Sequence, residues 1–140
     1  MACSKAPASK RGYQPAEHIA VGRARAPSRD EGVPIVGSGL SHHDLREFGP
    51  LAKAPSATVD HWLQDTLVNA RPAERVTRRL DWEAAPAARK AHPLEDHLLP
   101  LMVAVGAAGA DKAMRVDHES DLFGGIAVSS YRFGGGLDGA

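Results

Sequence analysis

The sequence predicts a fold of the α/β class, in which helices pack against a sheet. Apolar residues recur at helical spacing between prolines that can begin helices. Two other segments, 33–36 and 126–133, have the short apolar or alternating pattern of strands and lie far apart in the chain. Helices that alternate with strands favour a layered α/β arrangement. With 140 residues, 43% of them hydrophobic, the chain can bury one modest core.

Four helices are predicted in chain order. The first covers residues 15–31, opening at a proline and ending before a glycine. The second runs from Ser56, which can cap it, to about residue 69. The third opens at Pro72 and ends near residue 86, and the fourth covers 93–106 with a kink expected at Pro100.

The third helix has a predicted apolar face and a predicted solvated face. Val76, Leu80 and Trp82 form the apolar face at helical spacing. The solvated face is expected to carry three arginines: Arg75, Arg78 and Arg79.

The two predicted strands differ in quality. Residues 33–36 are an apolar run closed by a Gly-Ser-Gly turn, but Pro34 cannot donate to a sheet ladder. Residues 126–133 alternate and are rich in valine, serine and tyrosine, as strands are.

Charge and composition exclude several classes of protein. The 17 basic residues balance the 17 acidic residues, so no net charge draws the chain to nucleic acid or to an acidic membrane. The longest apolar run, residues 98–108, is far shorter than the roughly 20 residues that a membrane helix needs. The single cysteine, Cys3, excludes an internal disulfide and suits a reducing compartment, so we expect a cytoplasmic protein. Residues 1–12 are predicted to be a disordered leader and 135–140 a flexible tail.

Two histidine-bearing segments carry the candidate chemistry: residues 37–44, GSGLSHHD, and residues 92–97, HPLEDH. His42 and His43 follow the predicted strand 33–36, where α/β folds commonly bind ligands. Neutral imidazole binds Fe, Zn, Cu or Ni and also transfers protons, so the residue types leave metal ligand and acid/base catalyst both open. Glu95 and Asp96 have a structural alternative, since acidic residues favour the first turn of a helix. The Gly-Ser-Gly turn lacks the spacing of a phosphate-binding loop.

Three blocks in this order resemble one known family. Residues 36–49, VGSGLSHHDLREFG, are similar to a GSGxxxHNLR segment. Residues 92–101, HPLEDHLLPL, are similar to an HPxxDHxxPL block, and residues 129–133, SSYRF, to a final strand. Together they resemble the class III extradiol ring-cleavage dioxygenases of the DOPA 4,5-dioxygenase type, which are related to the protocatechuate 4,5-dioxygenase beta subunit. The resemblance extends over residues 13–133.

The resemblance implies a fold, an activity and a cofactor. The fold is the C-terminal portion of a central sheet flanked by helices, incomplete in itself, with the catalytic-domain part at 13–134. The activity is extradiol cleavage of a catechol-type ring, with a small aromatic diol and O2 as partners and one Fe(II) or Zn(II) ion as cofactor.

The resemblance also assigns site residues position by position. His43 stands at the family's acid/base histidine, immediately before the position of the Asn-Leu-Arg triplet, and His97 stands at its third metal ligand. Ser41, His42 and His92 are implied as neighbouring pocket residues.

Two departures from the family pattern shape the expected activity. The family takes its other two metal-ligand histidines from a Leu-Gly-His-Gly turn and a Ser-Ala-His-Trp strand end, and neither motif occurs in this chain. Pro34 and Asp44 also replace the expected aliphatic residue and asparagine. We therefore expect negligible ring cleavage by the chain alone.

Two alternatives remain open at this stage. One is an interaction module that pairs with a separately encoded N-terminal half or self-associates as a homo-oligomer, because an incomplete sheet leaves open edges. The other is a small metal-binding protein that uses His92 and His97, although two ligands do not make a closed site.

Overall fold

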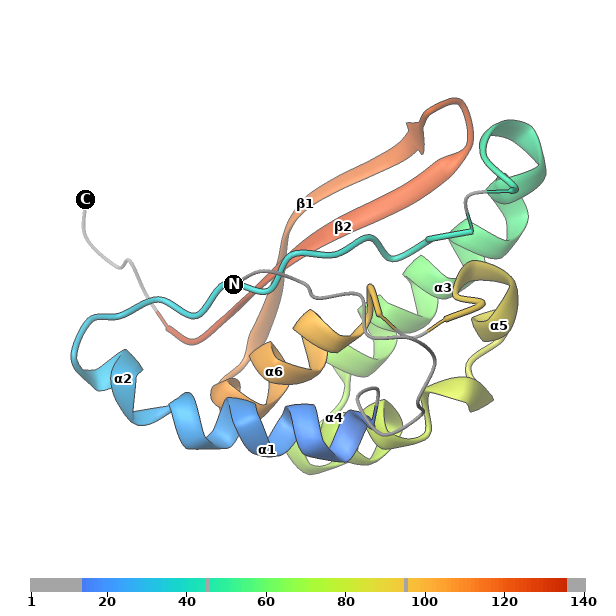
Figure 1. Cartoon of the computed structure of the whole chain (residues 1–140). Helices are drawn as coiled ribbons and strands as arrows, with labels where there is room; N and C mark the ends of the chain where they lie inside the picture. The colour runs from blue at the N-terminus through green and yellow to red at the C-terminus, as the bar shows by residue number, and fades with distance from the viewer. Residues whose placement is uncertain (1–13, 45, 95, 136–140) are drawn as a thin grey trace.

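The computed structural model describes residues 14–44, 46–94 and 96–135. These residues form a mixed α/β arrangement of helices beside one two-stranded sheet (Figure 1). The helices are α1 (Pro15–Arg25), α2 (Pro27–Asp30), α3 (Lys53–Gln64), α4 (Pro72–Leu80), α5 (Ala88–Ala91) and α6 (Leu99–Ala108). Short 3-10 turns η2 (Gly49–Ala52) and η4 (Trp82–Ala84) and a π turn η3 (Asp65–Asn69) connect them. The predicted leader and Cys3 lie outside the described residues, as does most of the predicted tail.

The sheet is an antiparallel hairpin of β1 (Ala113–Leu122) and β2 (Ile126–Phe133). Its register pairs Ala113 with Phe133 at one end and Leu122 with Ile126 at the turn. The prediction for β2 is confirmed, whereas β1 was not predicted. The expectation of two strands far apart in the chain is wrong, because the described strands are consecutive.

The strand predicted at residues 33–36 is not a strand in the structure. Residues 33–40 run extended, and within the described part of the chain they pair with no strand. Pro34 has no N–H to donate, and Val36 is 85% exposed, so neither ladder bonds nor burial hold this segment in a sheet.

The first two predicted helices are confirmed in place, with corrected ends. Residues 15–31 form α1 and α2, which divide at Pro27. The second helix begins at Lys53, so Ser56 lies inside it and is not its cap. The Ser56 hydroxyl instead donates to the carbonyl of Ala127 at 3.1 Å and accepts its N–H at 2.7 Å.

The fourth predicted helix starts later than expected. Residues 93, 94 and 96–98 form bends and turns, and α6 begins at Leu99. Pro100 therefore sits in the first turn, where its missing N–H costs no helical hydrogen bond, and the predicted kink does not arise.

The predicted faces of α4 are partly wrong. Arg75 and Arg79 are 2% and 0% exposed, whereas Leu80 is 47% exposed. The Arg79 guanidinium lies 3.9 Å from the centre of the Trp62 ring and donates to the Thr66 hydroxyl. Cation–π contact and this hydrogen bond favour a buried arginine that a polarity pattern assigns to solvent.

The core lies between the helices. α1 crosses α6 closely, and a methyl group at Gly22 or Gly106 would overlap the backbone carbonyl of the opposite helix. Buried residues of this layer include Ile19, Trp82 and Met102. Among the described residues no helix is long and apolar enough to cross a membrane.

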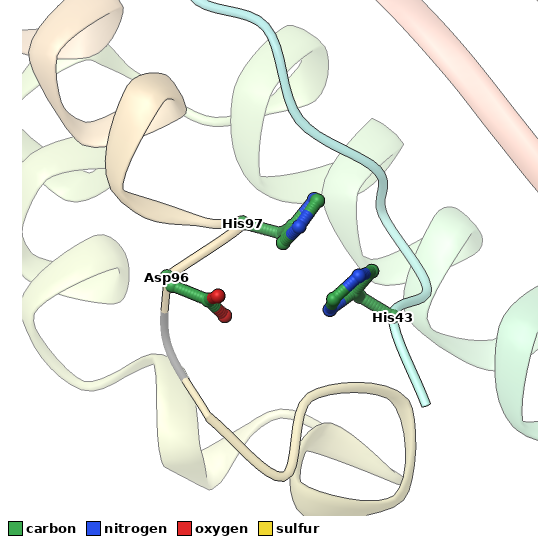
Figure 2. A group of neighbouring side chains, drawn as sticks. All are labelled: His43, Asp96 and His97. Carbon is green, nitrogen blue, oxygen red and sulfur yellow. The ribbon is translucent and has the colours of Figure 1, made fainter. Parts of the chain in front are cut away.

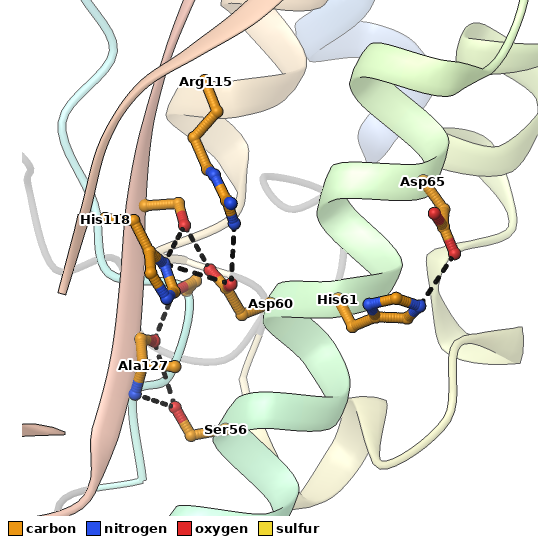
Figure 3. A network of polar contacts seen from close by, with 9 residues as sticks. Ser56, Asp60, His61, Asp65, Arg115, His118 and Ala127 are labelled. Carbon is orange, nitrogen blue, oxygen red and sulfur yellow. Dashed lines mark hydrogen bonds and ion pairs between the residues drawn. The ribbon is translucent and has the colours of Figure 1, made fainter. Parts of the chain in front are cut away.

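A polar network attaches the hairpin to α3 (Figure 3). Asp60, only 4% exposed, accepts the Ser129 hydroxyl at 2.6 Å and lies 3.4 Å from His118 and 3.8 Å from Arg115. Together with the bonds between Ser56 and Ala127, these contacts fix β2 along α3.

Candidate metal centre

The Gly-Ser-Gly segment, residues 37–39, lies directly against the turn before α6. A methyl group at Gly39 would overlap the carbonyl oxygen of His97, and one at Gly37 would press on the carbonyl of Pro100. Only glycine permits this approach of two backbones. The close contact brings the end of the extended segment, with its histidines, beside residues 96–97.

His43 and His97 meet at this junction. Their rings are stacked, with centroids 3.4 Å apart and planes inclined by 18°. One ligand atom each from His43, Asp96 and His97 lies within 4.8 Å of the others, and all three residues are half-buried. Figure 2 shows the three side chains directed into one space, His43 from the extended segment and the other two from the turn before α6.

Backbone hydrogen bonds hold both histidines in place. The His43 N–H donates to the carbonyl of Ala91 at 2.7 Å. The Leu40 N–H donates to Nδ1 of His97 at 3.3 Å. Since a backbone N–H can only donate, Nδ1 of His97 is the acceptor, and the neutral ring carries its proton on Nε2.

Burial favours the neutral form of His97. The loss of solvent lowers the pKa of His97, the nearby His43 lowers it further, and Asp96 opposes both effects. A metal ion binds the neutral ring, so this shift leaves His97 ready for coordination at lower pH than a free histidine. Oδ1 of Asp96 is buried and has no hydrogen-bond partner among the described residues.

His92 lies near the pair but supports the backbone. Its Nε2 donates to the carbonyl of Ser41 at 2.7 Å, and its ring meets Trp82 edge-on. Burial lowers the pKa of His92 to about 4, so the ring is neutral. His92 is not a member of the group of three possible metal ligands found among the described residues.

Ser41 and His42 also contact backbone. The Ser41 hydroxyl donates to the carbonyl of Ala127 at 3.1 Å, and Nε2 of the buried His42 lies 3.3 Å from the carbonyl of Glu47. Asp44, which stands where the family pattern has asparagine, accepts the Arg46 N–H, and this bond lowers the pKa of Asp44. All three residues shape the loop around His43.

From the sequence, Asp96 stayed open between metal binding and a role at a helix terminus, and it was not counted among the predicted site residues. Its position in the HPxxDHxxPL block was a signal, since the aspartate directly precedes the candidate ligand His97. Its helix-dipole interpretation is not supported, because α6 begins only at Leu99.

The other three histidines of the chain lie elsewhere. His18 bonds the carbonyl of Gln14, and His61 of α3 pairs with Asp65 of η3. His118 has a serine and an aspartate beside it, but Ser129 and Asp60 both contact its Nδ1. A nucleophilic triad needs them on opposite ring nitrogens, so this cluster is a structural network.

The donor set of His43, Asp96 and His97 fits a non-haem metal ion. Two imidazoles and one carboxylate match the ligands that hold Fe(II) in oxygenases and that also bind Zn(II). Three protein ligands leave coordination positions for small molecules. The stacked rings alternatively suit one ligand histidine with a second histidine beside it for proton transfer.

Comparison with known proteins gives the wider context of this site. Residues 11–134 match the family described as the catalytic LigB subunit of aromatic ring-opening dioxygenase. The chain is 37% identical over 119 residues to a 4,5-DOPA dioxygenase extradiol of Beta vulgaris, covering 83% of this chain and 43% of the relative. It is 32% identical to the protein of that name from Portulaca grandiflora, covering 87% of this chain and 45% of the relative.

A solved structure shares the fold. An uncharacterized protein of Escherichia coli K12 superposes with a TM-score of 0.65 at 24% identity, over 84% of this chain and 49% of that chain. The chain thus spans less than half the length of these curated relatives and about half of the solved structure. The match over residues 11–134 and the identity to the plant proteins show that the chain belongs to the LigB family of class III extradiol, aromatic ring-opening dioxygenases, as a partial chain.

Proposed function

We propose that this chain supplies part of the active site of an extradiol dioxygenase. It contributes some of the ligands of a metal ion and the histidine that transfers protons. The observation that carries the proposal is the stack of His43 on His97 beside Asp96. Membership of the family supports ring opening of a catechol-type diol by O2 as the overall reaction.

His97 is the proposed metal ligand, with Asp96 as the adjacent carboxylate. When bound, Fe(II), or Zn(II) in its place, supplies the Lewis acidity and open positions that bring an aromatic diol and O2 together. The lone pair of His97 Nδ1 now accepts the Leu40 N–H. Coordination through either ring nitrogen would break that bond, because Nε2 is free for a metal only in the tautomer that carries the proton on Nδ1.

His43 is the proposed acid/base residue. Its imidazole lies face to face with the His97 ring and is half-buried, so it stands next to the proposed ligand. We assign to it acceptance of a proton from a hydroxyl of the diol and return of a proton as the ring opens. Ser41, His42 and His92 hold the loop on which His43 is carried.

The proposed site is incomplete in this chain. The two further ligand motifs that the family resemblance implies are absent from the 140 residues, and the chain spans 43% of the Beta vulgaris relative. A second role follows: the chain acts as a half-domain that pairs with a complementary half. Among the described residues β2 pairs only with β1, and its other edge, which pairs with no strand there, favours this role.

Metal binding is the first test of the proposed function. Anaerobic calorimetry with Fe(II) and with Zn(II) on the purified chain is compared with the His97→Ala and His61→Ala variants. We expect binding that His97→Ala abolishes and His61→Ala leaves unchanged, because His61 is an exposed residue of α3. Equal binding by all three proteins would refute His97 as a ligand. Oxygen uptake with DOPA and with protocatechuate then tests the reaction.

A further inference from the structure

A long groove separates the extended segment from the hairpin. Its volume is about 600 Å³, and residues 34–41, α6 and β2 line it. In Figure 1 the segment runs lengthwise beside β2 and α6. His97 lines the same groove, so the groove leads to the candidate metal centre.

The groove follows two backbone edges. Eight consecutive residues of the segment, 34–41, and five consecutive residues of β2, 129–133, contribute to its lining. Side chains of an extended chain point alternately to opposite sides, so a cavity on one face would be lined by every second residue. Consecutive lining residues indicate that the groove runs along the edges. Five residues correspond to roughly 16 Å of strand.

Both edges have backbone groups without backbone partners. β2 pairs with β1 along one edge, and no other strand among the described residues pairs with its second edge. Residues 34–41 make no backbone–backbone hydrogen bond in the described part of the chain. Unpaired N–H and C=O groups along an extended edge are the template to which another strand adds.

The floor of the groove is apolar and small. Leu101, Ala104, Ala107 and Ala108 of α6 line it, while its charged lining residues are two arginines, Arg29 and Arg132. A floor of this kind accepts the apolar side chains that point to one face of a strand. It offers no acidic group to a metal or to a basic ligand.

We propose that this groove binds an extended protein segment that adds as a strand to the free edge of β2. The occupant is a segment from the part of the family's chain that lies outside the match to these 140 residues. Two observations select it: the Beta vulgaris relative has 57% of its length outside the match (100% less 43%), and the groove is lined by His97, the proposed ligand of an incomplete site. The proposal rests on the proposed function, whose complementary half it locates.

The test uses the unmatched part of the Beta vulgaris relative as the probe, co-expressed with the full 140-residue chain. Two variants obstruct the groove: Ala104→Arg on its floor and Ser130→Arg at β2. Ala54→Arg is the matched control, because Ala54 is an exposed residue of α3 outside the groove. Co-purification is measured for each, followed by hydrogen exchange of the backbone amides in the complex.

The expected result is a one-to-one complex with the wild-type chain and with Ala54→Arg. Both groove variants should bind the probe at least about tenfold more weakly than the wild-type chain does, since a buried charge opposes strand docking. Amides of residues 129–133 should become protected in the complex. Ser130 is exposed, so its variant tests the groove even where Ala104→Arg weakens α6.

Three results would overturn the proposal: no complex, a complex that both groove variants form equally well, or protection confined to other elements. A homodimer that protects residues 129–133 and excludes the probe would also overturn it, since the occupant would be a second copy. Metal binding by the chain and its loss in His97→Ala are measured separately. If the groove variants bind the probe normally while metal binding still depends on His97, the groove proposal fails and the proposed function stands. Loss of the His97 dependence would instead refute the proposed function.

Discussion

His43 and His97 lie face to face, with ring centroids 3.4 Å apart, although they come from segments far apart in the chain. The contact joins the end of an extended segment to the turn before α6. Each ring has a backbone anchor, through the His43 N–H and through Nδ1 of His97. The pair therefore places two chemically different functions, coordination and proton transfer, side by side.

Substitution of each histidine should separate these two functions. His43→Ala should weaken Fe(II) binding by no more than about 10- to 100-fold, the usual effect of losing a residue beside the ligands. In the complex with the complementary half it should lower kcat by about 10²- to 10⁴-fold, the usual contribution of an acid/base residue. His97→Ala should abolish metal binding itself. Calorimetry and oxygen uptake on both variants measure the difference, and loss of metal binding in His43→Ala would instead make His43 a ligand.

Gly39→Ala should disturb the metal group without removing any of its side chains. The added methyl would overlap the carbonyl oxygen of His97, so the segment must move away from the turn. We expect at least a tenfold loss of Fe(II) affinity by calorimetry. Ser38→Ala is the control, because Ser38 is exposed and directly adjacent. Equal affinities in the two variants would contradict the role of this close approach.

The elements that the sequence predicted correctly are those with a strong local pattern. Apolar spacing and opening prolines located α1, the start of α4 and most of α3, and alternation located β2. β1 was not predicted because eight of its ten residues are exposed, so burial imposes no alternation of apolar and polar residues on this strand. The burial of Arg79 depends on Trp62 and Thr66 in neighbouring elements, which no local pattern reveals.

The candidate site was predictable only in its parts. Composition pointed to two histidine segments, and the family resemblance singled out His43 and His97. Their stacking depends on Gly39 meeting the backbone of His97, a contact between distant segments that spacing cannot give. Asp96 joins the group because α6 starts three residues after it, a boundary that the sequence placed too early.

His92 should make the stability of the chain depend on pH. Burial lowers its folded-state pKa from 6.5 to about 4, so the unfolded chain binds a proton that the folded chain does not between these values. Stability contributed by the neutral ring is complete above pH 6.5, falls as the pH drops from 6.5 to 4, and is then constant. The loss is on the order of 3 kcal/mol.

Urea denaturation across this pH range measures the effect. His92→Gln keeps a donor for the Ser41 carbonyl but cannot titrate, so its stability should fall less between pH 6.5 and 4. His61→Gln removes an exposed histidine and should retain the wild-type slope. A slope in His92→Gln as steep as that of the wild type would assign the pH dependence to other groups.

Gly106→Ala should destabilise the fold where α1 crosses α6. Its methyl would overlap the backbone carbonyl of Ile19, and backbone cannot rotate away as a side chain can. The overpacking cost, about 1–3 kcal/mol, is partly offset by a gain in helix propensity of about 1 kcal/mol, so we expect a net loss of up to about 2 kcal/mol in the free energy of unfolding. Gly135→Ala, with no atom near its added methyl, is the control in the same urea titration. A net gain in Gly106→Ala would show that the helices separate easily.

The chain alone should show negligible ring cleavage. Its described metal group offers three ligand atoms, and the two further histidine motifs implied by the family resemblance are absent from the sequence. Oxygen uptake with DOPA, under anaerobically loaded Fe(II), should therefore stay at the rate of the His97→Ala variant. Addition of the unmatched part of the Beta vulgaris relative should raise the rate above that background, and only with His97 intact, because both halves then contribute to one site. Robust turnover by the isolated wild-type chain would mean that His43, Asp96 and His97 suffice as ligands, and the complementary half would then be unnecessary for catalysis.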